Sequence, residues 1–115
     1  MPHIIIEYPQ QSVSEDLLPA ILQAVHEAVV TSGLFDASHI KTRAYPMQFY
    51  TNAGSDQPYI HTMARIKSGR NSEQKKQLSE VILAAIGEQK LAVSVATVEI
   101  IDMDRDSYSK YSVLS

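Results

Sequence analysis

Residues 59–67 have the sequence YIHTMARIK, and two kinds of side chain alternate along this whole stretch. Successive side chains of a β-strand point to opposite faces of a sheet, so a period of two predicts a strand. One face carries Ile60, Thr62, Ala64 and Ile66, and the other carries Tyr59, His61, Met63, Arg65 and Lys67. We therefore expect a sheet with one face in the core and a more polar face outside it.

The flanking sequence predicts two helices and three further strands. These are a strand over residues 3–8, a helix from an N-cap at Asp16 to a stop at Gly33, a strand over 40–50 with a bend at Pro46, a helix after a cap formed by Asn71 and Gln74, and a strand over 97–103. Apolar residues at three- and four-residue steps predict the helices, and β-branched runs predict the strands.

The order of these elements is β-α-β followed by β-α-β, which predicts the α+β fold class. A β-α-β unit with parallel strands places its helix on one face of the sheet. Two such units give a four-stranded mixed sheet with both helices on one face, and the opposite face is left bare. Further copies of the chain would cover it most simply. A ferredoxin-like fold has the same element order, but there another strand separates the two strands of each unit.

Length and composition limit the classes of protein to consider. The chain has 115 residues, 44% hydrophobic and 20% charged, which is typical of a single globular domain over residues 1–115. The net charge of −3 argues against nucleic acid or an anionic membrane as partner. The absence of cysteine excludes thiol chemistry and agrees with a cytoplasmic location. We expect no signal peptide or membrane span, and we expect the polar tail from about residue 104 to pack on a neighbouring subunit.

Few residues remain that carry chemistry. The four histidines show no close metal-ligand spacing, so no metal site is expected, and His61 is interpreted as a structural, hydrogen-bonded histidine. Pro2 is different, because removal of Met1 would leave it with a free secondary amine. An α-amino group titrates near 8 in water, and burial or nearby cations lower its pKa toward the range of a useful general base. The plainer interpretation is chance, since proline makes up about 5% of residues.

Arg70 and Arg43 are the candidate anion-binding residues. Arg70 lies in a short loop directly before a helix, where free N–H groups attract anions and a guanidinium can hold a carboxylate with two hydrogen bonds. Arg43 lies two residues after Lys41 on a predicted strand, so their side chains share a face. Each arginine has a plainer interpretation, as a solvated loop residue for Arg70 and as a rim or paired residue for Arg43.

Six stretches of the sequence together carry a family resemblance. They are MPHIIIEY (1–8), DLLP (16–19), SGLF (32–35), IKTRA (40–44), HTM (61–63) and KSGRNS (67–72). The chain resembles the tautomerase superfamily in these stretches, and more closely the 5-carboxymethyl-2-hydroxymuconate Δ-isomerase family. The opening and the loop around Arg70 are the most specific parts, and the resemblance weakens beyond Asp102.

The resemblance implies a pair of β-α-β units and a homotrimer whose sheets form a central barrel. It implies an isomerase of aromatic catabolism that uses no cofactor or metal and acts on an unsaturated 2-hydroxy (enol) di- or tricarboxylate. Met1 would be removed, and the amino-terminal Pro2 would be the catalytic base. Arg43 and Arg70 would bind the carboxylates of the substrate, with Lys41 as an additional helper.

Two alternatives stay open at this point. One is a tautomerase with a different enol or 2-oxo acid as substrate. The other is a non-catalytic small-molecule-binding or signalling module on a tautomerase or ferredoxin-like fold. Strand order distinguishes the folds, and turnover of a simple enol such as phenylenolpyruvate distinguishes enzyme from binding module.

Overall fold

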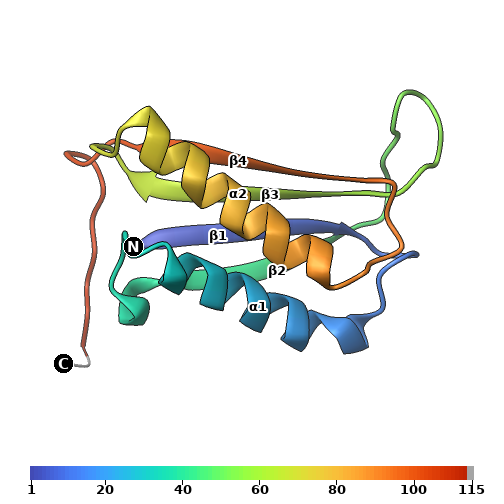
Figure 1. The fold of residues 1–115 in the computed structure, drawn as a ribbon, viewed down its shortest axis with the longest axis horizontal. Helices are drawn as coiled ribbons and strands as arrows, with labels where there is room; N and C mark the ends of the chain where they lie inside the picture. Colours follow the sequence, from blue (N-terminus) through green and yellow to red (C-terminus); the bar gives the residue numbers. More distant parts are fainter. Residues whose placement is uncertain (114–115) are drawn as a thin grey trace.

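A computed structural model describes residues 1–113 and contains a four-stranded mixed sheet beside two α-helices (Figure 1). The elements are β1 (Pro2–Pro9), the 3-10 turn η1 (Glu15–Leu17), α1 (Leu18–Thr31), the 3-10 turn η2 (Ala37–His39), β2 (Lys41–Met47), β3 (Tyr59–Lys67), α2 (Ser72–Glu88) and β4 (Val95–Met103). The predicted α+β class is therefore confirmed.

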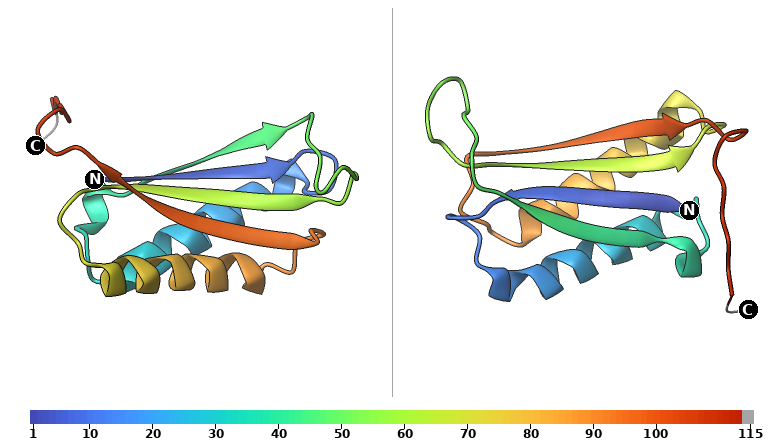
Figure 2. Two further views of the ribbon diagram at one scale, coloured as in Figure 1. Left: turned by 90° about the horizontal axis from the view of Figure 1, so that it is seen from above. Right: turned by 180° about the vertical axis from the view of Figure 1, so that it is seen from behind.

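The order of the strands is β2-β1-β3-β4, and it decides between the two folds that fit the element order. β1 runs parallel to β2, β3 runs parallel to β4, and β1 pairs antiparallel with β3 at the centre of the sheet. Each β-α-β unit keeps its two strands side by side, which excludes the ferredoxin-like alternative. Seen from above in Figure 2, both helices lie against the same face of the sheet, as predicted.

The hydrophobic core lies between the sheet and the helices. Each strand contributes every second side chain, on the face that is turned toward the helices. Those of Ile4, Ile6, Ile60 and Ile66 are fully buried. In the same cluster the helices contribute Ile21, Val25 and Val29 from α1 and Leu78, Ile82 and Ile86 from α2. Full burial of one such aliphatic side chain contributes about 1.5–3 kcal/mol relative to its exposure. The alternation in residues 59–67 therefore predicted the buried face correctly.

Two predicted signals mark helix ends as expected. The capping box of α2 is present, because Gln74 N donates to Asn71 Oδ1 at 2.8 Å and Asn71 N donates to Gln74 Oε1 at 3.0 Å. Gly33 follows α1 with a φ of +75°, a conformation that glycine adopts without strain. Within residues 1–113, neither helix combines the length and the apolar character that crossing a membrane requires.

Other boundaries differ from the prediction by one to three residues. α1 begins at Leu18 and not after an N-cap at Asp16, because Ser14 accepts a hydrogen bond from Asp16 N and caps the 3-10 turn η1 instead. Pro19 still falls in the first turn of α1, where its missing N–H has no cost. β2 ends at Met47 and not at residue 50, since its neighbour β1 ends at Pro9 and offers no further partner.

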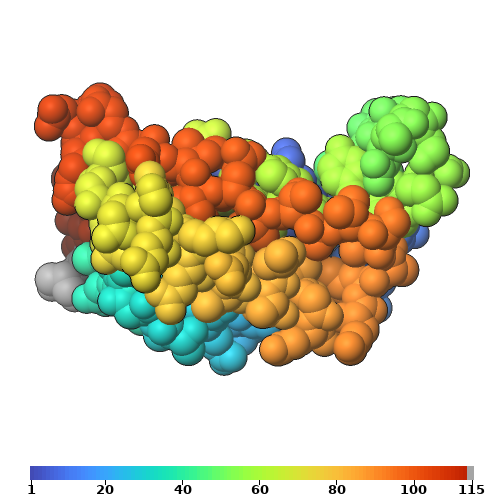
Figure 3. Space-filling model, turned by 45° about the horizontal axis from the view of Figure 1, so that its top comes forward, coloured from blue at the N-terminus to red at the C-terminus, as the bar shows by residue number. Residues whose placement is uncertain are grey.

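The sheet face turned away from the helices is only partly covered in the single chain. Tyr45 of β2 and Val95 of β4 lie on this face and remain 52% and 43% exposed. The loop that connects β2 and β3 stands out from the body of the molecule in Figure 3, and its Phe49 is 93% exposed. The bare face that the element order predicted is therefore present.

The stability of the core can be tested within α2. Ile82→Ala is expected to lower the free energy of unfolding by about 2–5 kcal/mol, because the side chain is fully buried and its loss leaves a cavity. Leu83→Ala, one residue further on, is the control, with an expected change within about 0.5 kcal/mol because Leu83 is 41% exposed. Urea unfolding followed by circular dichroism measures both values. Equal losses in the two variants would contradict the assigned core face.

Candidate active site

The amino terminus of the chain lies in a pocket at one end of the sheet. Met1 is only 8% exposed, and its amino nitrogen donates a hydrogen bond to the carbonyl oxygen of His39 at 3.0 Å. The pocket has a volume of about 200 Å³, and the side chains beside Met1 include Lys67, Arg70 and Arg105. A partly buried amine therefore faces a pocket lined by three cations and by the carboxylate of Asp36.

The central strand pair places the terminus there. Pro2 lies opposite Ile66 in the antiparallel register of β1 and β3, and Pro2 is itself buried. The start of β1 is therefore beside the end of β3, where the chain continues into the loop that carries Arg70. Because Met1 is bonded to Pro2 and lines the same pocket as Arg70, the structure brings these two predicted site residues to one place.

The pocket changes the acidity of the terminal amine. It lowers the pKa of the Met1 amino group from 8.0 to about 6. Burial is the largest cause, because it removes water from the charged form of the amine. The neighbouring positive charges lower the pKa further, in the order Lys41, Lys110, Lys67 and Arg70. With this pKa the Met1 amine is mostly neutral at pH 7, and neutral is the form that a general base needs.

Arg70 is held in place at the pocket. The residue before it, Gly69, has a φ of +127°, which only glycine adopts readily. Nη2 of Arg70 donates to the carbonyl oxygen of Leu34 at 2.7 Å, and the guanidinium carbon lies 4.8 Å from the centre of the Phe35 ring. These two contacts position the guanidinium in advance, so less side-chain entropy is lost when an anion binds.

Arg43 and Lys41 share the sheet face turned away from the helices, as their spacing predicted. In the register of β1 and β2, Lys41 lies beside His3 and Arg43 beside Ile5. Nη1 of Arg43 donates to Nδ1 of His3 at 3.2 Å, and Arg43 does not line the pocket at the terminus. Lys41 lies nearer the terminus, since its Nζ is 3.5 Å from the carbonyl oxygen of His39.

Two residues at the terminus were not singled out from the sequence. Nη1 of Arg105 donates to the carbonyl oxygen of Ser68 at 3.4 Å, and the hydroxyl of Tyr108 contacts both His3 and Met1. Both belong to the polar segment after β4, whose sequence has no helical or strand period. The tyrosines of that segment were the one available signal, and they carry no information about where the segment folds.

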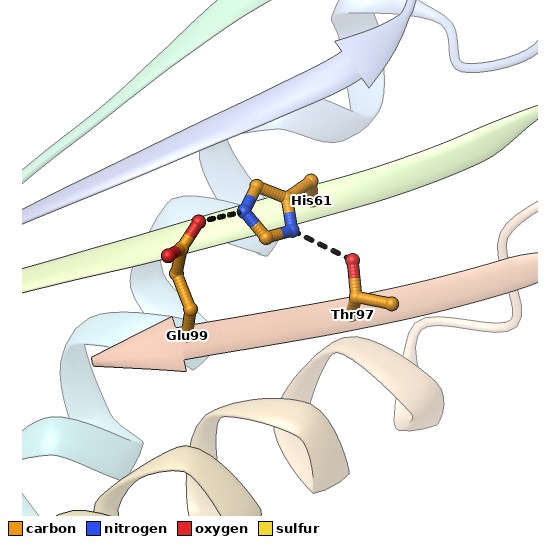
Figure 4. Close-up of polar contacts among 3 residues, drawn as sticks. All are labelled: His61, Thr97 and Glu99. Carbon is orange, nitrogen blue, oxygen red and sulfur yellow. Dashed lines mark hydrogen bonds and ion pairs between the residues drawn. The ribbon is translucent and has the colours of Figure 1, made fainter. Parts of the chain in front are cut away.

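His61 has the structural role that its sequence context predicted. Its Nε2 lies 2.5 Å from Glu99 Oε2, and its Nδ1 lies 2.6 Å from Thr97 Oγ1 (Figure 4). Both ring nitrogens are thus occupied by partners on β4, the neighbouring strand. Within residues 1–113, no three histidine or carboxylate side chains are grouped closely enough to hold a metal ion.

Comparison with known proteins adds a second line of observation to this geometry. A family model described as 5-carboxymethyl-2-hydroxymuconate isomerase matches residues 2–103. The chain belongs to this family. A curated relative, the 5-carboxymethyl-2-hydroxymuconate Delta-isomerase of Escherichia coli, is 26% identical over 88 residues, which cover 75% of this chain and 70% of the relative. The resemblance found in the sequence is confirmed, and isomerase or tautomerase chemistry is the class that the family supports.

Solved structures show the same fold. A 5-carboxymethyl-2-hydroxymuconate isomerase from Deinococcus radiodurans R1 superimposes with a TM-score of 0.82 at 22% identity, covering 96% of this chain and 88% of that one. A fused 4-OT wild-type symmetric trimer superimposes with a TM-score of 0.81 at 18% identity, covering 98% and 94%. Because the identities are low, these superpositions establish the fold alone, and that fold is tautomerase-like.

The charge around the terminus can be tested directly by titration. In protein produced with Met1 retained, the amino group is expected to titrate near 6, and Lys41→Met is expected to raise that pKa because it removes one of the cations that lower it. Lys76→Met is the control, since this exposed lysine on α2 is not among the charges that act on the amine. NMR titration of isotope-labelled Met1 measures the pKa. A value near 8 in the unmodified chain would show that the terminus is solvated.

Proposed function

We propose that this chain is an isomerase that moves a proton within an unsaturated 2-hydroxy (enol) di- or tricarboxylate, with the amine of Pro2 as the base after removal of Met1. The observation that carries the proposal is the buried, cationic pocket around the start of β1. Membership of the 5-carboxymethyl-2-hydroxymuconate isomerase family supports the same reaction class. We place this activity in the cytoplasm and assign it no cofactor.

The proposed reaction conserves all protons. The neutral Pro2 nitrogen takes the proton from the enol hydroxyl, and its own lone pair forms the new N–H bond. The electrons of the broken O–H bond leave a conjugated enolate whose negative charge spreads along the double bonds. The same proton then passes from Pro2 to a distant carbon of that system, where a C–H bond forms. Pro2 is neutral again at the end, and no oxidant or reductant is needed.

The cations of the pocket have two functions in this proposal. Arg70, held by Leu34 and Phe35, binds a carboxylate of the substrate and stabilises the negative charge of the enolate. Lys41 adds positive potential from the adjoining strand, and it lowers the pKa of the terminal amine. Binding of an anionic substrate and tuning of the base therefore depend on the same charges. The resemblance also implies a carboxylate contact for Arg43, whose guanidinium hydrogen-bonds to His3 in this structure, and the kinetics of an Arg43 variant distinguish these two roles.

Removal of Met1 and the function of Pro2 are tested together. Pro2→Ala replaces the ring-held secondary amine with a more mobile primary amine. It is expected to lower the rate of isomerisation of the muconate substrate, or of phenylenolpyruvate, by up to about a hundredfold, because a misplacement of a reacting group by about 1 Å can cost that much. Mass spectrometry of protein from its natural host must show a mature chain that begins at Pro2.

An intact Met1 in the active protein would refute the proposal, because an acylated nitrogen has no basic lone pair. A chain whose Pro2 nitrogen is kept acylated and that is as fast as the mature chain would also refute it. Binding of the enol without any turnover would instead support a non-catalytic module on the same fold.

We further propose that three copies pack their bare sheet faces into a central barrel, with the outer side of the segment from residue 104 against a neighbour while Arg105 and Tyr108 keep their contacts to Ser68 and His3 of their own chain. Exposed Tyr45 and Val95 on that face support this assembly, as does the solved neighbour that is a symmetric trimer. Sedimentation equilibrium is expected to give the mass of three 12.8 kDa chains.

Val95→Arg is expected to shift the assembly toward monomer, because a charge on a buried interface is costly to desolvate. Leu83→Arg is the matched control, since Leu83 is similarly exposed but lies on a helix. A monomeric wild type, or equal behaviour of the two variants, would contradict the proposed interface.

A further inference from the structure

The segment after β4 folds back across the amino-terminal end of β1, and Figures 1 and 2 show it beside the start of the chain. Contacts from Arg105 and Tyr108 hold it there. Arg105 donates to the carbonyl oxygen of Ser68, and the Nζ of Lys67 lies 5.4 Å from the centre of the Tyr108 ring. Tyr108 is thereby placed against residues at the start of β1, far from it in sequence.

A chain of hydrogen bonds connects Tyr108 to β2. Nη1 of Arg43 lies 3.2 Å from Nδ1 of His3, and Nε2 of His3 lies 3.0 Å from the hydroxyl of Tyr108. The hydroxyl in turn donates to the sulfur of Met1. One series of hydrogen bonds therefore links β2, β1 and the segment after β4, and it ends at Met1.

The chemistry of the groups fixes which atom donates and which accepts in each of these hydrogen bonds. A guanidinium is always a donor, so Nδ1 of His3 must accept, and the single proton of the neutral ring lies on Nε2. That proton is donated to the oxygen of Tyr108. Because the side of the hydroxyl that faces His3 accepts this hydrogen bond, the hydroxyl proton of Tyr108 points to the other side, where Met1 lies.

The neutral form of His3 is the one that the surroundings favour. Burial lowers the pKa of His3, and the charge of Arg43 is the next largest cause, followed by the charge of Lys41. A doubly protonated ring beside Arg43 would place two positive groups in contact, and it would leave the guanidinium without its acceptor.

We propose that Tyr108 is a further substrate-contacting residue of this site, and that Arg43 and His3 are positioning residues that aim its hydroxyl proton at the enolate oxygen. This inference rests on the proposed function. Met1 is bonded to the nitrogen of Pro2, so a molecule that exchanges a proton with that nitrogen in the mature protein approaches through the position of Met1. The Tyr108 hydroxyl already donates into that position.

The hydroxyl neither gains nor loses a proton in this role. It donates a hydrogen bond to an oxygen that becomes negative while the proton resides on Pro2, and the bond strengthens as the charge develops. Such a donor lowers the barrier more than it tightens substrate binding, so its loss reduces kcat with little change in KM. Arg70 also holds a carboxylate that is already charged in the ground state, so its loss would raise KM as well as lower kcat.

Tyr108→Phe removes the hydroxyl alone and is expected to reduce kcat on the order of a hundredfold with KM little changed. Tyr111→Phe is the matched control on the same segment, since Tyr111 is 89% exposed, and its kinetics are expected to equal those of the wild type. Thermal unfolding of both variants verifies that they fold. A Tyr108→Phe enzyme as fast as Tyr111→Phe would overturn the proposal.

A double-mutant cycle distinguishes a positioning arginine from one that binds substrate. If Arg43 acts through Tyr108, Arg43→Met slows the wild type but causes no further loss in the Tyr108→Phe background. If the two losses multiply, Arg43 has an independent contact with the substrate, and the proposed role of Arg43 is wrong.

The tautomer of His3 provides a measurement that needs no activity. Nitrogen-15 NMR of the labelled imidazole at pH 7 is expected to show a neutral ring protonated at Nε2. A ring protonated at Nδ1 would overturn the proposed direction of the chain. A wild type that turns over no enol would refute the proposed function, and the tautomer would then still decide the arrangement of Arg43, His3 and Tyr108.

Discussion

The antiparallel pairing of β1 with β3 is the constraint on which the rest of the structure depends. It joins the two β-α-β units into one sheet, and its register sets Pro2 opposite Ile66. The start of the chain is thereby fixed beside the loop that precedes α2, and the positive charges of both units gather around one terminal amine. A shift of this register by one residue would exchange the two faces of β1 and expose Ile4 and Ile6 to solvent.

Much of the fold could be predicted from short-range patterns. The period of two in residues 59–67 predicted the buried face, and the spacing of Asn71 and Gln74 predicted the capping box of α2. The start of α1 was predicted to within one residue. The exact residue did not follow from the sequence, since Ser14 and Asp16 are both good caps and only the final backbone decides between them. The strand order followed from no local pattern, because both candidate folds share one order of elements.

The site was predictable only where chemistry or resemblance singled out a residue. Pro2 was a candidate because an amino-terminal proline is a basic amine, and Arg70 because it precedes a helix. Tyr108 and Arg105 were not, because Tyr108 contacts Met1 at the opposite end of the sequence, Arg105 contacts Ser68 in its middle, and no period places the segment that carries them. The bond between Arg43 and His3 likewise depends on strand register, which the separate strand predictions did not contain.

The burial of Met1 has a practical consequence for how the protein can be handled. Its amino nitrogen is bonded to the carbonyl of His39, and its side chain is enclosed beside Tyr108. A purification tag or fusion partner joined ahead of Met1 would acylate the Met1 nitrogen that donates to His39, and under the proposed mechanism it would also prevent the removal of Met1 that frees the Pro2 nitrogen. Recombinant material intended for kinetic work should therefore be made untagged, or with a cleavable leader whose removal leaves Pro2 first.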